Sequence, residues 1–141
     1  MSTFPKSPKE TVRGMMYFAR MLDKIRLHAR GELGSDYHEN LGKTRAADGM
    51  CCNFLRVDYA TVRDRVLQGG TDEEILDWCF EHGRAMNEAD IKVWNGFISK
   101  LGWRDFASGH LERAKTEAGV ADGAELMTIP DLIDFEEGRL S

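Results

Sequence analysis

Apolar residues recur at helical spacing along most of this chain. In the first thirty residues, five of them follow one another at intervals of three and four, which predicts one helix with a single buried face. These five are Met15, Phe18, Leu22, Ile25 and Ala29. Ser7, Pro8 and Glu10 form a capping-box pattern, so we expect this helix to begin at about residue 7 and to end near residue 29.

Further capping residues divide the rest of the chain into shorter helices. Asp58, Thr71 and Asn87 each stand before a segment with helical apolar spacing, which predicts a helix start at each of them. A more polar helix is expected over about 105–117, and a short last helix after Thr128. Glycines follow most of these segments and indicate where the helices end.

Residues 31–50 interrupt the helical pattern with four glycines and scattered polar groups, which predicts a long ordered loop with one helical turn near 37–40. The segment 51–57 is too short for periodicity to decide between one very short strand and a helical turn. We therefore expect a single all-α domain over residues 7–138, with five or six helices and this loop laid over the helical core.

Composition and charge limit the partners and the compartment. The chain has 141 residues, 42% of them hydrophobic and 30% charged, which fits one soluble domain. Its formal net charge of −5 argues against nucleic acid as a partner, and its longest apolar run, residues 15–19, is far shorter than the ~20 residues of a membrane span. We expect no secretory signal, and three cysteines without a need for disulfide bonds favour a reducing cytoplasm.

The net charge conceals two halves of opposite sign. Residues 1–70 hold 12 basic and 8 acidic side chains, whereas residues 71–141 hold 7 basic and 16 acidic ones. The basic excess of the first half allows an anionic partner there despite the negative total. The opposite signs also allow the two halves to pair with each other, within one chain or between two chains.

The predicted first helix carries a stripe of basic and aromatic residues opposite its core face. At 100° per residue the stripe consists of Arg13, Tyr17, Arg20, Lys24 and His28. Apolar residues edge the stripe, which is unusual for a helix face in solvent. It could therefore line a pocket for an anion, with arginine as a bidentate donor and lysine as a point charge. The alternative is a solvated face whose cations pair with a neighbouring acid or with acids of the second half.

The loop supplies the second group of candidate residues. Asp36, Tyr37, His38, Asn40 and Lys43 place five polar or titratable side chains within eight residues. Histidine suits proton transfer near neutral pH, and loop residues on a rigid scaffold often form binding sites. The alternative is that Asp36 caps a turn and His38 is an ordinary surface residue.

The three cysteines allow a thiol chemistry. A thiol of Cys51 or Cys52 that faced Lys43 or His38 would have a lowered pKa and could act as a nucleophile. The alternative is that both are buried and inert. Cys79 falls on the apolar face of its predicted helix, where it is expected to pack in the core.

Two other motifs point to no site. Gly42-Lys43-Thr44 lacks the glycine five residues earlier that a phosphate-binding loop requires. Cys79 and His82 have a spacing that can chelate, but the chain contains neither a C-x-x-C pair nor an H-E-x-x-H segment. We therefore predict neither a metal site nor a cofactor.

Several short strings of residues in this order resemble a known family. They are Arg20–Arg26, Asp36–His38, Asn40–Lys43, Cys51–Cys52, Thr71–Ile75, Trp78–Gly83 and Val93–Asn95. Together, from about Ser7 to Gly138, they resemble a family of small bacterial proteins that is classed only as a domain of unknown function. The resemblance implies a bacterial cytoplasmic protein. It assigns no activity, cofactor or catalytic residue.

Three hypotheses of function from different classes remain. The leading hypothesis is that the protein binds, or acts on, a small anionic metabolite where the stripe meets the loop. The residues of that predicted site are Arg13, Tyr17, Arg20, Lys24, His28, Tyr37, His38 and Lys43. The alternative is a non-enzymatic interaction protein that self-associates through its oppositely charged halves. A thiol or metal enzyme is a third hypothesis.

Overall fold

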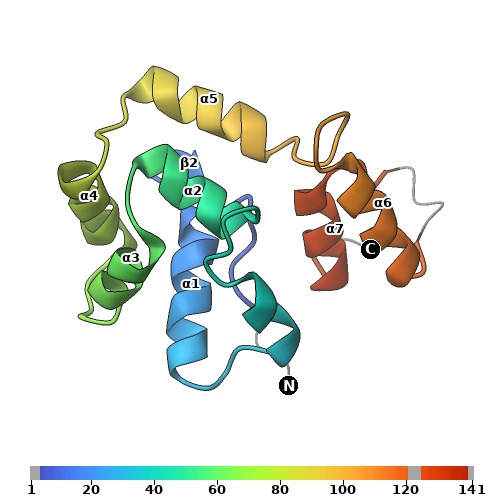
Figure 1. Cartoon of the computed structure of the whole chain (residues 1–141), viewed down its shortest axis with the longest axis horizontal. Coiled ribbons are helices and arrows are strands. Elements are labelled where there is room, and N and C mark those ends of the chain that lie inside the picture. Colours follow the sequence, from blue (N-terminus) through green and yellow to red (C-terminus); the bar gives the residue numbers. More distant parts are fainter. Residues whose placement is uncertain (1–3, 121–124, 140–141) are drawn as a thin grey trace.

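Helix α1, Phe18–Ala29, runs through the middle of the molecule (Figure 1). The computed structural model describes residues 4–120 and 125–139. Around α1 lie η1 (a 3-10 helix, Ser35–Asn40), α2 (Ala47–Leu55), α3 (Tyr59–Val66), α4 (Asp72–His82), α5 (Glu88–Ile98), α6 (Ser108–Glu117) and α7 (Ile129–Glu136). The predicted all-α fold is confirmed, with more and shorter helices in the described residues than expected.

The first helix begins about ten residues later than predicted. Residues Thr11–Val12 (β1) and Met15–Met16 (β2) form a two-stranded antiparallel hairpin instead. Its turn residues, Arg13 and Gly14, have φ angles of 49° and 84°, the left-handed pair that a tight hairpin turn requires. The apolar spacing misled the prediction because Met15 is fully buried on a strand and therefore continues the buried face of α1.

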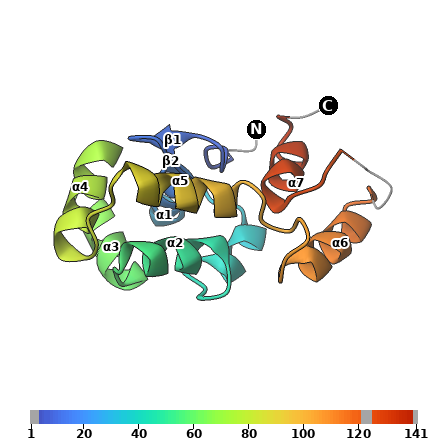
Figure 2. The same cartoon turned by 90° about the horizontal axis from the view of Figure 1, so that it is seen from above.

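The hairpin is fixed to α5 by two polar side chains in the middle of that helix. Trp94 Nε1 donates to the carbonyl of Met16 at 2.8 Å. The amide of Asn95 accepts from the Met16 N–H at 2.9 Å and donates to the Gly14 carbonyl at 2.7 Å. The hairpin therefore lies beside α5, as the view from above shows (Figure 2).

Four of the predicted helix starts after the loop are confirmed, whereas the polar helix expected from about residue 105 begins at Ser108. Asp58, Thr71, Asn87 and Thr128 are N-caps whose side chains accept a backbone N–H of the first turn. At Thr71 and Asn87 a carboxylate at the third helical position bonds back, which completes a capping box.

The 31–50 loop is only partly irregular. It contains the predicted turn near 37–40 as η1, and its last residues already belong to α2. The segment 51–57 is not a strand, because α2 continues to Leu55 and ends at Arg56 in the left-handed conformation, φ 58°.

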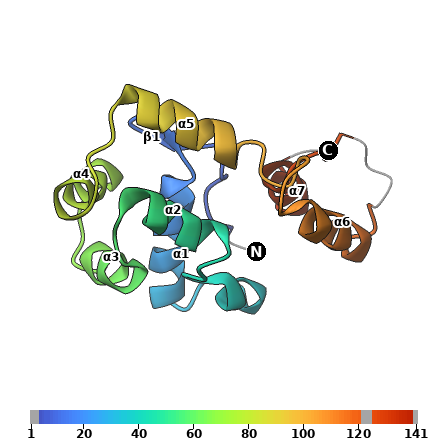
Figure 3. The same cartoon turned by 45° about the horizontal axis from the view of Figure 1, so that its top comes forward.

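Helices α6 and α7 form a pair to one side of the other helices (Figure 3). The pair has a small apolar cluster of its own, formed by Leu111, Leu126 and Leu132. Ile129 connects this cluster to the main core, and its N–H donates to the Leu101 carbonyl at 2.7 Å. The charged contacts described below complete the attachment of this pair.

Candidate functional site

The central residues of the predicted stripe lie inside the protein. Tyr17, Arg20 and Lys24 are only 3%, 3% and 5% exposed, and each contacts a carboxylate. The alternative interpretation, a solvated helix face, is therefore wrong for these three side chains. The expected pairing with an acid of the second half is confirmed for Arg20, whose partner is Glu137.

Arg20 and Glu137 form a two-pronged ion pair. Nη1 and Nη2 donate to the two carboxylate oxygens at 2.8 Å each, and both side chains are at most 4% exposed. Tyr37 on η1 donates to the same carboxylate at 2.6 Å, and Arg139 donates to it as well. Although burial alone would raise the pKa of Glu137, the hydrogen bonds from these three donors lower it.

Tyr17, Lys24 and Asp48 form a second buried group. The Tyr17 hydroxyl donates to Asp48 at 2.6 Å and accepts from Lys24 Nζ at 3.0 Å, while Lys24 also contacts Asp48 at 2.8 Å. The other Asp48 oxygen accepts the Gly42 N–H of the loop at 3.1 Å. Burial raises the pKa of Tyr17 and lowers the pKa of Lys24.

The remaining predicted residues lie at the surface. His28 and His38 meet edge to face with ring centroids 4.6 Å apart, and His38 Nε2 lies 3.0 Å from the Leu33 carbonyl oxygen. Arg13 is in the hairpin turn rather than on α1, and its guanidinium pairs with Asp77 at 2.9 Å. Lys43 is exposed in the loop.

The structure thus brings the first helix and the loop together, as the hypothesis requires. Arg20 meets Tyr37, the Tyr17–Lys24 pair meets Gly42 through Asp48, and His28 meets His38. At the first two places, carboxylates of the protein itself form ion pairs with the cations. Among the described residues, no buried side-chain nitrogen or oxygen lacks a hydrogen-bond partner. These two groups therefore act chiefly in stability.

The thiols are buried and free. Burial raises the pKa of Cys51, and it raises those of Cys52 and Cys79 to about 12. Such thiols are poor nucleophiles near neutral pH. In the part of the chain that the structure describes, no group of three His, Cys, Asp or Glu side chains could hold a metal ion.

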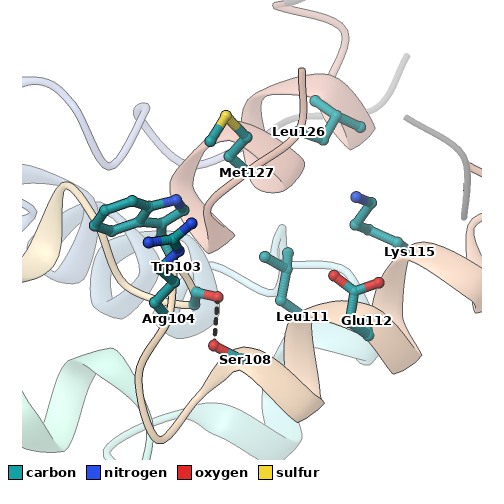
Figure 4. A pocket seen from close by; sticks show the side chains of 9 residues that line it. Trp103, Arg104, Ser108, Leu111, Glu112, Lys115, Leu126 and Met127 are labelled. Atoms are coloured by element: carbon teal, nitrogen blue, oxygen red, sulfur yellow. Dashed lines mark hydrogen bonds between the residues drawn. The ribbon is translucent and has the colours of Figure 1, made fainter. Parts of the chain in front are cut away.

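A hollow of about 310 Å³ lies between α6 and the segment that leads into α7 (Figure 4). This volume is near the lower end of the range for small-molecule sites. Its polar lining consists of Arg104, Ser108, Glu112 and Lys115. Its apolar lining consists of Trp103, Leu111, Leu126 and Met127. None of these residues belongs to the predicted site.

The loop before α6 holds one end of the hollow in place. The Asp105 carboxylate accepts the N–H groups of Gly102 and Ala107, and Ser108 Oγ donates to the Gly102 carbonyl at 2.9 Å (Figure 4). Gly102, with φ 96°, is needed here because an added Cβ would lie only 3.1 Å from Leu111 and Ile129 side-chain atoms.

The same loop presents an aromatic ring and a cation to the hollow. Arg104 has a left-handed backbone, φ 50°, and its guanidinium lies 5.1 Å from the centroid of the Trp103 ring. Strained backbone at a non-glycine residue is often found at binding sites. Lys115, only 6% exposed, projects from α6 on the far side of the hollow (Figure 4). Arg104, Lys115 and the apolar lining suit an organic anion.

Sequence signals for this hollow are weak. Leu111 and Lys115 follow each other at helical spacing, so the lysine stands on the buried face of a polar helix. A lysine on a buried helix face is rare and could have drawn attention to α6. Leu126 and Met127 lie in an irregular connection, for which apolar periodicity makes no prediction. Their place in the lining of the hollow could therefore not be predicted from the sequence.

The comparisons with known proteins agree with the resemblance noted in the sequence. None of the helices in residues 4–120 and 125–139 has the length and apolar character needed to span a bilayer. Among curated proteins, none matches this chain. Residues 2–139 match the family described as Domain of unknown function (DUF5069), and because this match covers nearly the whole sequence, the chain belongs to that family.

Proposed function

We propose that this protein binds a small organic anion in the hollow between α6 and the segment leading into α7. The observation that carries the proposal is that two cations, Arg104 and Lys115, outnumber the one carboxylate, Glu112, in the lining of a hollow whose other side chains are mostly apolar. Small-molecule sites typically combine mostly apolar walls with a few charged groups that orient the ligand. The ligand class is the one predicted from the sequence, and the location differs.

The predicted stripe gives less support to the same function. Arg20 and Lys24 face Glu137 and Asp48, so an external anion would have to compete with buried carboxylates. Displacing one of them would leave an unpaired buried charge, which costs several kcal/mol. His28, His38 and Lys43 are exposed at the surface and do not line the hollow.

We also propose a bacterial cytoplasm as the setting. The three cysteines are free thiols, which persist in a reducing compartment. Buried thiols with raised pKa values add no support to a thiol enzyme. We therefore favour ligand binding without covalent chemistry.

The test is a titration followed by NMR of the tryptophan indole N–H groups, with inorganic phosphate, acetate and benzoate as probes. Trp103 lines the hollow, whereas the Trp94 indole donates to the Met16 carbonyl and serves as an internal control. We expect the Trp103 signal to shift and the Trp94 signal to stay. Lys115→Gln should weaken this response, and Lys100→Gln, at an exposed lysine outside the hollow, should not. An unchanged Trp103 signal with all three anions would contradict the proposal.

Self-association is the second candidate function. It is favoured by Phe106, which is 72% exposed and stacks on Phe97 with ring centroids 6.2 Å apart. Large exposed aromatic side chains are enriched in protein interfaces. The charge asymmetry supports it less, because basic residues of the first half pair with acids of the second half within the chain. Light scattering of Phe106→Ser beside the natural protein, at low and high salt, tests this alternative, and a strict monomer throughout would exclude it.

A further inference from the structure

We infer that the ligand of the hollow is a dianion whose two acidic groups are joined by a short apolar spacer, as in an aliphatic dicarboxylate. This inference rests on the proposed function and narrows its ligand class. It depends on where the two cations lie within the hollow, and on what lies between them.

The two cations stand at opposite ends of the hollow. Arg104 lies at the end formed by the loop before α6, and Lys115 lies at the end formed by the last turn of α6 (Figure 4). Ser108, the first residue of α6, lies at the Arg104 end, and Lys115 is seven residues further on. Seven residues of helix correspond to about 10 Å along the axis, and the side chains of Arg104 and Lys115 lie on opposite sides of the lining (Figure 4), an arrangement that suits two separate acidic groups.

The space between the two ends is apolar. Leu111 lies on α6 between them, and Leu126 and Met127 face it from the opposite wall (Figure 4). A polar group at this position of the ligand would lose its water without gaining a partner, which costs free energy. Methylene groups fit there, because burying each one contributes favourably. The two cations and the apolar residues between them therefore favour an acidic group, a short hydrocarbon and a second acidic group.

Glu112 limits which ligands fit at the lysine end. It lies beside Lys115 in the lining, and in residues 4–120 and 125–139 the two side chains form no ion pair with each other. Its negative charge would repel an incoming acid and would favour a ligand with an ammonium group at that end. A zwitterion is therefore the competing ligand class, which the experiment must distinguish from a dianion.

The experiment compares three probes that share a six-carbon chain: adipate, hexanoate and 6-aminohexanoate. Each Kd is measured from the Trp103 indole shift. We expect adipate to bind about tenfold more tightly than hexanoate, because one additional charge-assisted contact is worth about that factor. The zwitterion should bind no more tightly than hexanoate.

Single variants test the two ends separately. Arg104→Gln and Lys115→Gln should each bring adipate close to the Kd of hexanoate, whereas Lys115→Arg should retain most of the preference. Glu112→Gln should strengthen adipate binding, a gain that a misfolded variant could not show. Arg113→Gln is the matched control, because this arginine lies on α6 and does not line the hollow.

The outcomes separate the two proposals. Equal affinity for adipate and hexanoate would overturn the two-ended ligand and leave anion binding intact. Tighter binding of 6-aminohexanoate than of adipate would overturn the dianion in favour of a zwitterion. If neither hexanoate nor adipate shifts the Trp103 indole signal, the proposed binding of carboxylate ligands in the hollow is itself wrong.

Discussion

Arg20 and Glu137 are 117 residues apart in the sequence, yet they form a buried two-pronged ion pair in which both donor–acceptor distances are 2.8 Å. The pair joins the central helix α1 to the end of α7. Lys9 adds a more exposed contact to Asp131 at 2.7 Å, and Ser7 donates to Asp134. The first and last parts of the chain are therefore held together by complementary charge.

Removing one partner of this pair should destabilise the protein strongly. Glu137→Ala leaves the Arg20 guanidinium buried without its carboxylate, which typically costs about 3–5 kcal/mol, whereas Arg20→Ala leaves Glu137 with Arg139 and Tyr37 and should cost less. The double variant should lose much less than the sum of the two single losses, because no unpaired charge remains. Urea unfolding of the four proteins measures this coupling. Additive losses would mean that the two side chains do not stabilise each other.

Acid should weaken the same contact. Because the folded state lowers the pKa of Glu137 below its ordinary 4.5, the unfolded chain takes up this proton more readily. The contribution is therefore complete above pH 4.5 and is lost as the pH falls toward the pKa of the folded state. Glu137→Gln should show a shallower fall in unfolding free energy between pH 6 and pH 3 than the natural protein. Parallel curves would assign the acid sensitivity to other carboxylates.

The thiols should be unreactive in the folded protein. Burial raises the pKa of Cys52 to about 12, so almost no thiolate exists at pH 8. Iodoacetamide should therefore label none of the three cysteines within minutes under native conditions and all of them in urea. Mass spectrometry counts the adducts. Rapid native labelling of Cys51 or Cys52 would restore the thiol hypothesis.

Two glycines should respond in opposite directions to alanine. Gly96 lies in the interior of α5 with nothing within 4 Å of an added Cβ, so Gly96→Ala should stabilise by up to about 1 kcal/mol. At Gly83 an added Cβ would lie 2.2 Å from the Leu55 carbonyl oxygen, so Gly83→Ala should destabilise by about 1–3 kcal/mol. Thermal melts of both variants check the contrast. A loss at Gly96 as large as that at Gly83 would contradict it.

The helix starts were the most predictable features, because they depend on residues that are close in the sequence. Asp58, Thr71, Asn87 and Thr128 cap their helices because each satisfies backbone groups only three residues away. The beginning of α1 was not predictable in the same way. Met15 is buried in the same core as α1 although it lies on a strand, so apolar spacing could not separate the two.

The predicted site shows a different limit of sequence reasoning. The periodicity grouped Arg20 and Lys24 on one face of a helix, and this grouping is correct. Whether that face meets solvent, a ligand or another part of the chain depends on Glu137 and Asp48, which come from distant segments. The hollow was missed for the same reason, since Trp103 and Met127 meet only in the folded chain.

The long separation between Arg20 and its partner has a consequence for biosynthesis. A ribosome adds about 5–20 residues per second, so roughly 6–23 s pass between the addition of Arg20 and that of Glu137. During that interval the guanidinium can be hydrated only if α1 is not yet covered. Because burying an unpaired charge is costly, we expect the face of α1 that carries Arg20 to be covered only once α7 has been made.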